Sequence, residues 1–245
     1  AISVFMGDQC NWQAWGDILH SVKTGETAFE HVFGMGFFQH LDRHPESAKV
    51  FSEAMTSGSE PFNAAVTAAY DFSTIKEIVD VGGGHGSFIS TILKAYPEMK
   101  GILFDVPHVS EGARCRLRAE GVADRCRVVA GDFLESIPEG ADAYIMKHII
   151  HDWDEASAIN ILKNCRRAMR PDAKLLLVEG VLSCGDTPAI GKLVDLQMLL
   201  MPGGRERTEE EYRQLLEAAG FRLTSITPTR SPLSVIEGAV MVNSK

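Results

Sequence analysis

The stretch 79–86, VDVGGGHG, decides the fold of this chain. An apolar run ends in it at Asp80 and Val81, and Gly82, Gly84 and Gly86 follow in alternation with other residues. Glycine adopts positive φ and lets the backbone approach a ligand closely, as a strand-to-helix turn at a binding site requires. The stretch therefore predicts a strand, a glycine loop and a helix, in that order.

The segments after this loop alternate between apolar strand patterns and helical patterns. Near-continuous hydrophobic strands separated by helices are typical of a parallel sheet that is covered on both faces. The last two strand patterns, 221–229 and 233–242, have no helix between them and predict an antiparallel pair at the end of the sheet. The other predicted strands are 77–82, 100–106, 126–133, 142–150 and 173–182, and the helices between them are 86–97, 109–121 and 155–171.

Residues 1–73 show a different pattern and are predicted to be helical. Apolar residues recur in 12–22 with the spacing of one helix face. We expect this helical segment to precede an α/β unit of Rossmann-like type at 74–245. The first residue is Ala1 rather than Met, and we expect a further N-terminal part of the protein to be missing from this chain.

Composition and charge narrow the classes of function. The chain has 245 residues, of which 45% are hydrophobic, and this suits a globular protein. Its formal net charge of −9 argues against binding to a nucleic-acid backbone. No apolar run of about 18 residues predicts a membrane span. The five cysteines are scattered without a C-x-x-C pair, which argues against a zinc site or a disulfide framework and favours the cytoplasm.

Acidic residues end the two predicted strands that follow the glycine loop. Asp105 ends the second strand, which is the position of an acid that binds the two hydroxyls of a ribose. Asp132 precedes Phe133 at the end of the third, and such a pair can bind an adenine amino group and cover its ring. The loop departs from the dinucleotide fingerprint because Ser87 occupies the third glycine position, and it lacks the lysine of a P-loop. Asp80 would repel a pyrophosphate but suits a cationic amino-acid group.

Together these motifs resemble the class I methyltransferases that depend on S-adenosylmethionine (SAM). More closely, the chain is similar to the small-molecule O-methyltransferases, a family that includes plant caffeate and flavonoid enzymes, hydroxyindole O-methyltransferase and bacterial antibiotic-tailoring enzymes. The resemblance covers nearly the whole chain. It rests on AFEHVFGMGFFQHL (28–41), FSEAM (51–55), YDFS (70–73), VDVGGGHG (79–86), GDF (131–133), KHIIHDWDE (147–155), LLLVE (175–179) and GGRERTEEEYRQLLEAAGF (203–221).

The resemblance implies a function and a cofactor. The family transfers a methyl group from SAM, giving S-adenosylhomocysteine, to a hydroxyl of an aromatic small molecule. Its members are usually homodimers through a winged-helix-like N-terminal domain, which this chain would lack. The family also has members that bind SAM and perform hydroxylation or decarboxylation, and a non-catalytic SAM-binding module is a further alternative. The SAM contacts implied by the resemblance are Ser73, Gly82, Gly84, Asp105, Asp132, Phe133 and Lys147.

His151 raises a separate question, because it is either a catalytic base or an ordinary histidine at a surface turn. The resemblance implies that His151 is the general base and that Glu179 and Glu211 support it. A phenol with a pKa near 10 costs about 4 kcal/mol to ionise at pH 7, and a positioned base typically accelerates a reaction ~10²–10⁴-fold. A carboxylate behind the imidazole would fix its tautomer and stabilise the imidazolium. Asp152 is an alternative orienting acid, Glu179 an alternative turn cap, and acids such as Glu211 are favoured at helix starts in any case.

The helical pattern 192–204 is expected to cover the acceptor. Met198 and Met201 could pack on a flat apolar ring, since methionine side chains adapt to irregular surfaces, but such a stripe is equally typical of plain core. Asp195 lies on the same stretch and is a further candidate. Phe29 and Phe33 could add aromatic surface. No metal is expected, because SAM carries an activated methyl group.

Overall fold

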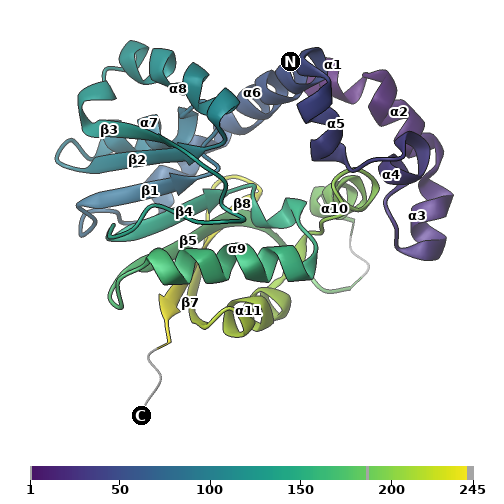
Figure 1. Cartoon of the computed structure of the whole chain (residues 1–245). Coiled ribbons are helices and arrows are strands. Elements are labelled where there is room, and N and C mark those ends of the chain that lie inside the picture. Colours follow the sequence, from purple (N-terminus) through teal and green to yellow (C-terminus); the bar gives the residue numbers. More distant parts are fainter. Residues whose placement is uncertain (1, 186–187, 242–245) are drawn as a thin grey trace.

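The computed structural model describes residues 2–185 and 188–241, and within them helices cover both faces of an eight-stranded sheet (Figure 1). The sheet has the strand order β3-β2-β1-β4-β5-β8-β7, and β6 pairs with β5 off this path. The strands are β1 Glu77–Val81, β2 Lys100–Asp105, β3 Cys126–Ala130, β4 Ala143–Lys147, β5 Lys174–Leu182, β6 Arg207–Thr208, β7 Phe221–Pro228 and β8 Leu233–Val240.

The strand directions confirm the predicted α/β sheet. β1 to β5 pair in parallel, so their carboxyl ends lie at one edge. β8 runs antiparallel to both of its neighbours, β5 and β7, and it lies between them. The order of the chain reverses between β1 and β4, which is where open α/β sheets bind their ligands.

Each face of the sheet packs against its own set of helices. α9 (Glu155–Ala168) and α11 (Glu209–Ala218) cover one face, and α7 (Ser87–Ala95) and α8 (Pro107–Ala119) cover the other. In α7 the apolar residues Phe88, Ile89, Ile92 and Leu93 recur at helical spacing and are all buried. This spacing gives the helix a single apolar side, which is why it packs flat on the strands.

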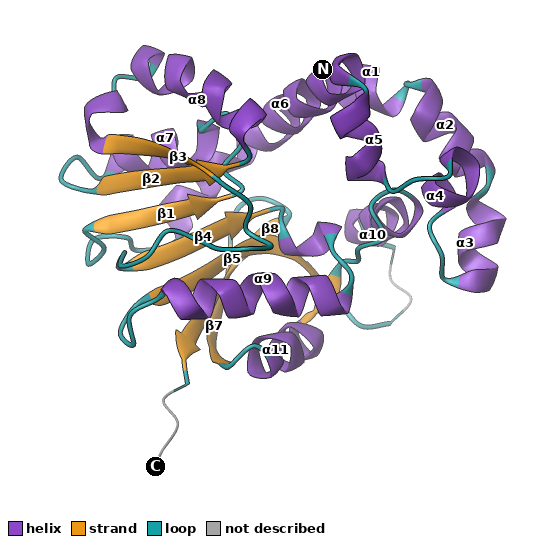
Figure 2. Cartoon of the chain, in the orientation of Figure 1, coloured by secondary structure: helices purple, strands orange, loops and turns teal. Residues whose placement is uncertain are grey.

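The segment before the sheet is helical, as predicted. It comprises α1 (Ile2–Met6), α2 (Gln9–Gly16), α3 (Ile18–Thr24), α4 (Ala28–Phe33), α5 (Phe37–Arg43) and α6 (Pro45–Ala69). Figure 2 shows α1–α5 and α10 (Ile190–Leu200) beyond the carboxyl ends of the strands. The core of this region also contains Leu200 and Met201 from the end of α10. The division at residues 73 and 74 stays a prediction.

The predicted single apolar face in 12–22 needs a correction. The helix breaks at Asp17, so that α2 and α3 are separate helices. Trp12, Leu19 and Val22 are exposed, while Trp15 and Ile18 are partly buried against the core of the helical region. Because of the break, each of the two helices has one apolar residue of the pattern against the core, Trp15 in α2 and Ile18 in α3, and the others point to solvent.

α6 connects the helical region to the sheet. Its 25 residues include Pro61, which lacks the N–H that a helix interior uses, and Asn63, which is buried near β4. None of the described helices, α6 included, is long and apolar enough to cross a membrane.

Candidate active site

The glycine loop after β1 has the conformation that the sequence requires. Gly82 and Gly84 have φ of 69° and 57°, in the left-handed region that favours glycine. A Cβ on Gly82 would lie 2.4 Å from Cδ1 of Ile149, so any larger residue would displace the segment after β4. The loop therefore lies directly against the segment that leads to His151.

Asp105 lies at the end of β2 and contacts this loop. Its Oδ2 accepts a hydrogen bond from the backbone N–H of Gly84 at 2.8 Å, and its Oδ1 accepts one from Val106 at 2.7 Å. The structure thus places Asp105 and the glycine loop together, as the sequence predicts for a ribose site.

Asp132 and Phe133 follow β3 at the same edge. Asp132 is exposed, and its Oδ1 accepts the N–H of Leu134 at 2.8 Å, which fixes the turn. Phe133 is half-buried with its ring edge-on to Trp153 at 5.8 Å between centroids. Trp153 also stacks on Phe38 of α5 at 5.5 Å, so this aromatic group joins the sheet edge to the N-terminal helices.

Lys147 and Asp80 lie on the other side of the loop, where Lys147 is half-buried and Asp80 is buried. Its Nζ donates to Ser59 Oγ at 3.2 Å and to Asn63, and lies 4.8 Å from the ring centre of Phe88. Burial lowers the pKa of Lys147 to about 8 although Asp80 opposes the shift. The pKa of Asp80 is raised to about 7 by burial, against the effect of Lys147. Asp80 Oδ2 is buried without a hydrogen-bond partner among the described residues, which leaves it able to bind a cationic group.

Ser73 is not at this edge, and its predicted contact with the cofactor is corrected. It lies before β1, at the amino end of the strand, where its N–H donates to Asp71 at 2.9 Å. The neighbouring Lys76 and Glu77 bond to Asp142, which precedes β4 and marks the same amino edge. In a parallel sheet this edge is opposite to the ligand-binding one.

His151 lies in a short 3₁₀ turn, Ile150–Asp152, directly after β4. Its side chain is buried, with 6% of the residue exposed. Its Nδ1 lies 2.7 Å from Glu206 Oε1 and 3.7 Å from Glu179 Oε2, and its Nε2 lies 3.5 Å from Asp152 Oδ1. A carboxylate cannot donate when ionised, so Nδ1 carries the proton and donates to Glu206.

The surrounding charges change the titration of His151. Burial by itself would lower the pKa of the imidazole, but the carboxylates of Glu179, Asp152 and Glu206 outweigh it and raise the pKa to about 10. Burial raises the pKa of Glu179 to about 7 even though His151 opposes the shift. At neutral pH His151 is therefore an imidazolium, and Glu179 carries only part of its negative charge.

Glu179, in the second half of β5, makes both of the contacts that the sequence analysis left as alternatives. Its Oε1 accepts the N–H groups of Ile149 at 3.1 Å and Ile150 at 2.9 Å, so it does cap the turn after β4. Its Oε2 faces His151 and has no hydrogen-bond partner among the described residues. The same carboxylate thus fixes the turn and contributes charge to the imidazole.

Glu211 does not lie beside His151, and the prediction that it supports the base is corrected. Its Oε2 accepts the N–H and the hydroxyl of Thr208 at 2.8 and 2.9 Å, which completes a capping box at the start of α11, and its other oxygen pairs with Arg205. The spacing T-x-x-E in 208–211 is the sequence signature of that capping box. The second carboxylate at the histidine is Glu206, five residues earlier in the same motif.

His148 is a residue that the sequence reasoning missed. Among the described residues it is the one non-glycine with positive φ, 55°, a conformation that clusters at functional sites. Its Nδ1 is buried without a hydrogen-bond partner among those residues and lies 3.9 Å from Glu179 Oε2. Burial, with His151 and Lys147 nearby, lowers its pKa well below the usual value. Its place in KHIIH, three residues before His151, was the signal available in the sequence.

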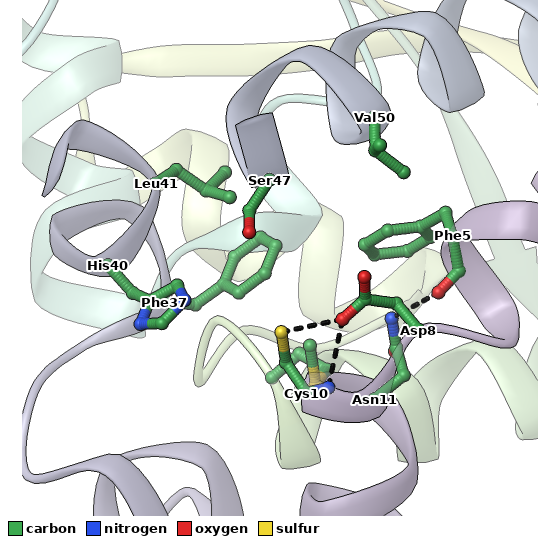
Figure 3. A pocket seen from close by; sticks show the side chains of 10 residues that line it. Phe5, Asp8, Cys10, Asn11, Phe37, His40, Leu41, Ser47 and Val50 are labelled. Carbon is green, nitrogen blue, oxygen red and sulfur yellow. Dashed lines mark hydrogen bonds between the residues drawn. The ribbon is translucent and has the colours of Figure 1, made fainter. Parts of the chain in front are cut away.

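The candidates for acceptor contact separate into two places. Asp195 on α10 accepts the N–H of Glu206 at 2.8 Å, so it lies in the catalytic segment, and Met198 is half-buried on the same helix. Met201 is buried and lines a cavity of about 10 Å³ among the N-terminal helices, with Phe5 and Phe37 (Figure 3). That volume admits about one water molecule, so an aromatic acceptor does not fit there in this conformation.

The two phenylalanines proposed as aromatic surface are core residues or close to it. Phe29 is fully buried, and its ring packs on Phe33 at 4.5 Å. Two groups in the described part of the chain bring histidines and carboxylates close enough to hold a metal ion: Asp17, His20 and His31, and His148, His151 and Glu179. The expectation that no metal takes part stays a prediction.

Comparison with known proteins agrees with this geometry. The family model of the O-methyltransferase domain matches residues 12–222. Phenazine O-methyltransferase PhzM of Lysobacter antibioticus is 48% identical over 226 residues, which are 92% of this chain and 66% of that protein. Mitomycin biosynthesis 6-O-methyltransferase of Streptomyces lavendulae is 40% identical over 95% of this chain and 67% of its own length. The chain thus spans about two thirds of the length of these curated relatives.

Solved structures show the same similarity. The crystal structure of LaPhzM superposes with a TM-score of 0.94 at 46% identity, covering 98% of this chain and 72% of that one. Human N-acetylserotonin methyltransferase in complex with SAM has a TM-score of 0.87 at 26% identity, covering 97% and 69%. The resemblance seen in the sequence motifs is confirmed, and the chain belongs to the O-methyltransferase family.

Proposed function

We propose that this chain is the SAM-binding catalytic part of an O-methyltransferase that methylates a hydroxyl of an aromatic small molecule. The observation that carries the proposal is the buried His151 with Glu206 at 2.7 Å, beside the glycine loop at the carboxyl edge of the sheet. The relatives named for phenazine and mitomycin support the same class of acceptor.

The residues at the sheet edge fit SAM. Asp105, with the backbone of Gly82 and Gly84, would hold the ribose, and Asp132 with Phe133 would hold the adenine. The unpartnered Oδ2 of Asp80 is suited to the cationic amino group, directly or through water. When bound, SAM supplies a methyl group activated by its sulfonium, so the protein has to activate only the acceptor oxygen.

His151 performs that activation in the proposal. Nδ1–H stays donated to Glu206, and in the fraction of molecules whose imidazole is neutral, Nε2 accepts the proton of the acceptor hydroxyl. A phenol has a pKa near 10, and the pKa of His151 is raised to about 10, so the two groups are matched and the transfer between them is close to balanced. The productive ion pair of imidazolium and phenolate holds one proton fewer than the resting imidazolium with a neutral phenol. The rate should therefore rise with pH.

A panel of phenolic and polyketide acceptors tests the proposed function. The protein is incubated with SAM and each acceptor, and mass spectrometry follows both the methylated product and S-adenosylhomocysteine. We expect the two products in equal amounts from at least one phenolic acceptor. A hydroxylated or decarboxylated product, or SAM binding without turnover of any acceptor, would support one of the alternative functions instead.

We also propose that the whole protein is a cytoplasmic homodimer. The exposed apolar side chains of Trp12, Leu19 and Val22 on α2 and α3 support a partner surface in this region. The free cysteines, of which Cys126 and Cys165 are buried, support a reducing compartment. Light scattering of a full-length protein tests the assembly, and a monomer would contradict it.

A further inference from the structure

Arg207 is a fully buried arginine that contacts the turn carrying His151. It lies in β6, and its residue exposure is 0%. Its Nη1 donates to the carbonyl oxygens of Ile150 at 3.1 Å and Arg205 at 3.3 Å. Its Nη2 donates to Trp153 O at 3.4 Å and lies 3.2 Å from Glu155 Oε2. The guanidinium thus bonds to the residue before His151 and to a residue two positions after it.

These contacts are unusual for a buried charge. A buried guanidinium loses its hydration, and a carboxylate partner normally compensates for the loss. Here the carboxylate partner, Glu155, has a side chain that is 53% exposed, and Nε of Arg207 has no hydrogen-bond partner among the described residues. Apolar residues often replace buried ion pairs without loss of stability, so stability alone gives a poor reason for an arginine at this position.

The rest of the segment 204–207 lies against the same turn. A Cβ on Gly204 would lie 1.9 Å from the carbonyl oxygen of His151, a distance that excludes any side chain. The N–H of Arg205 donates to that carbonyl at 2.8 Å, and the next residue, Glu206, contacts the imidazole. The base and its carboxylate partner therefore lie on two segments that are joined at successive residues.

We propose that Arg207 is a positioning residue that holds the turn of His151 and the segment of Glu206 in the register where imidazole and carboxylate meet. The inference rests on the proposed function, in which that pair activates the acceptor. A fork of fixed N–H donors suits this role, because it bonds to carbonyl groups on both sides of the histidine at once. A lysine ammonium is a point charge without that fork.

Gly180 provides a second, independent way to disturb the pair. A Cβ on Gly180 of β5 would lie 2.7 Å from Glu206 Oε2. On another side, Asp195 fixes the backbone of Glu206. Gly180→Ala should therefore push the carboxylate away from His151 while it leaves the contacts of Arg207 in place.

Arg125 offers a matched control. It donates to the carbonyl oxygens of Leu93 and Met99, both at 2.8 Å, and it precedes β3 at the amino edge of the sheet. Arg125→Met removes the same kind of arginine-to-backbone contacts, but at the edge of the sheet opposite to the catalytic turn. Its loss should reduce stability without changing the His151–Glu206 pair.

The experiment compares Arg207→Met, Arg207→Lys, Gly180→Ala and Arg125→Met. Nitrogen-15 NMR of the imidazoles gives the pKa of His151 without any turnover, and thermal unfolding, SAM affinity and kcat are measured beside it. For Arg207→Met and Gly180→Ala we expect the pKa of His151 to fall below about 10, because Glu206 moves away, while Glu179 and Asp152 keep the pKa above its ordinary value near 6.5. We expect kcat to fall about 10²-fold, as for a catalytic group misplaced by roughly 1 Å, with SAM affinity unchanged. Arg207→Lys should lie between.

The outcomes separate this inference from the proposed function. If Arg207→Met and Arg125→Met lose similar stability and both keep the wild-type titration of His151, Arg207 is only structural and the inference is overturned. If Arg207→Met does not fold, the titration of Arg207→Lys decides in the same way. If the titration shifts as expected but the wild-type protein methylates no acceptor, the positioning role stands and the proposed function fails.

Discussion

The carboxyl edge of the sheet and the N-terminal helices differ in whether a local sequence pattern is enough to place their residues. At the sheet edge, Asp105 ends β2, His151 follows β4 and Glu179 lies in the second half of β5, and parallel pairing brings them together. In the helical region, the core around Phe29 is completed by Leu200 and Met201 at the end of α10, far away in the sequence. Trp15 illustrates this dependence, since its Nε1 donates to Gln197 of α10 at 2.7 Å. Local pattern therefore specifies the first region and underdetermines the second.

The largest effect should come from removing the imidazole. His151→Ala is expected to lower kcat ~10²–10⁴-fold, the usual range for losing a positioned base. SAM affinity should change little, because His151 is assigned to the acceptor and not to the cofactor. Single-turnover kinetics with the best acceptor, with SAM affinity from calorimetry, check both halves. Near-normal turnover would return His151 to the ordinary turn histidine of the alternative reading.

The pH dependence should follow the same group. The pKa of His151 is about 10 in the folded chain and near 6.5 when unfolded, so its contribution to stability is fully present below pH ~6.5 and is lost as the pH rises through about 10. The fraction of His151 that is neutral increases over the same range of pH. The rate should therefore rise from pH 7 to 9 while the free energy of unfolding falls. Rate profiles and urea unfolding at matched pH measure both trends. A rate that is flat over this range would contradict the raised pKa.

Glu206→Gln and Glu211→Gln form a matched pair from one segment. Glu206→Gln should lower kcat about 10- to 100-fold and shift the rise in rate to lower pH, because the imidazole loses an adjacent charge. Glu211→Gln should cost about 1 kcal/mol of unfolding free energy or less through the capping box, with kcat unchanged. The two rate profiles decide between these acids, and a larger loss of kcat from Glu211→Gln would restore the original assignment.

This pair also shows how much of the site the sequence could predict. The strand ends gave Asp105, Asp132, His151 and Glu179 correctly as residues of one edge, because one rule of parallel sheets places them there. Glu206 and Glu211 follow none of the strands β1 to β5, and the position of Glu206 depends on how the loop after α10 packs on the turn after β4. The capping box at Thr208 was the local signal that assigns Glu211 to a helix start.

The helical region shows the complementary limit. Its helical state follows from the apolar spacing, but the directions of α2, α3 and α4 depend on contacts with α10 that no local pattern encodes. The break at Asp17 therefore went unpredicted, and so did the exposure of half of the apolar stripe in 12–22. The prediction for Ser73 was wrong for a related reason. A residue that precedes a parallel strand lies at the amino edge of the sheet, whatever motif contains it.

A moderate effect is expected at the cofactor end of the site. Asp105→Ala should weaken SAM binding tenfold or more, since bonds to a charged group are worth ~1.5–3 kcal/mol each. The change should leave the titration of His151 unaltered, because Asp105 contacts the glycine loop and not the catalytic turn. Calorimetry with SAM measures the loss. Unchanged affinity would remove Asp105 from the site.

The smallest effect on this chain should come from the exposed apolar side chains of α2 and α3. Trp12 is 68% exposed, so Trp12→Ser should change the unfolding free energy by less than about 0.5 kcal/mol, the usual range for surface substitutions. Phe29→Ala, in the buried core of the same region, should cost about 3–5 kcal/mol of unfolding free energy.

In the full-length protein Trp12→Ser should nevertheless weaken self-association if α2 and α3 face a second copy. Analytical ultracentrifugation measures the self-association, and urea unfolding measures the stability. A Trp12→Ser protein that keeps its dimer constant would show that the partner surface lies elsewhere, and one that unfolds as easily as Phe29→Ala would show that Trp12 belongs to the core.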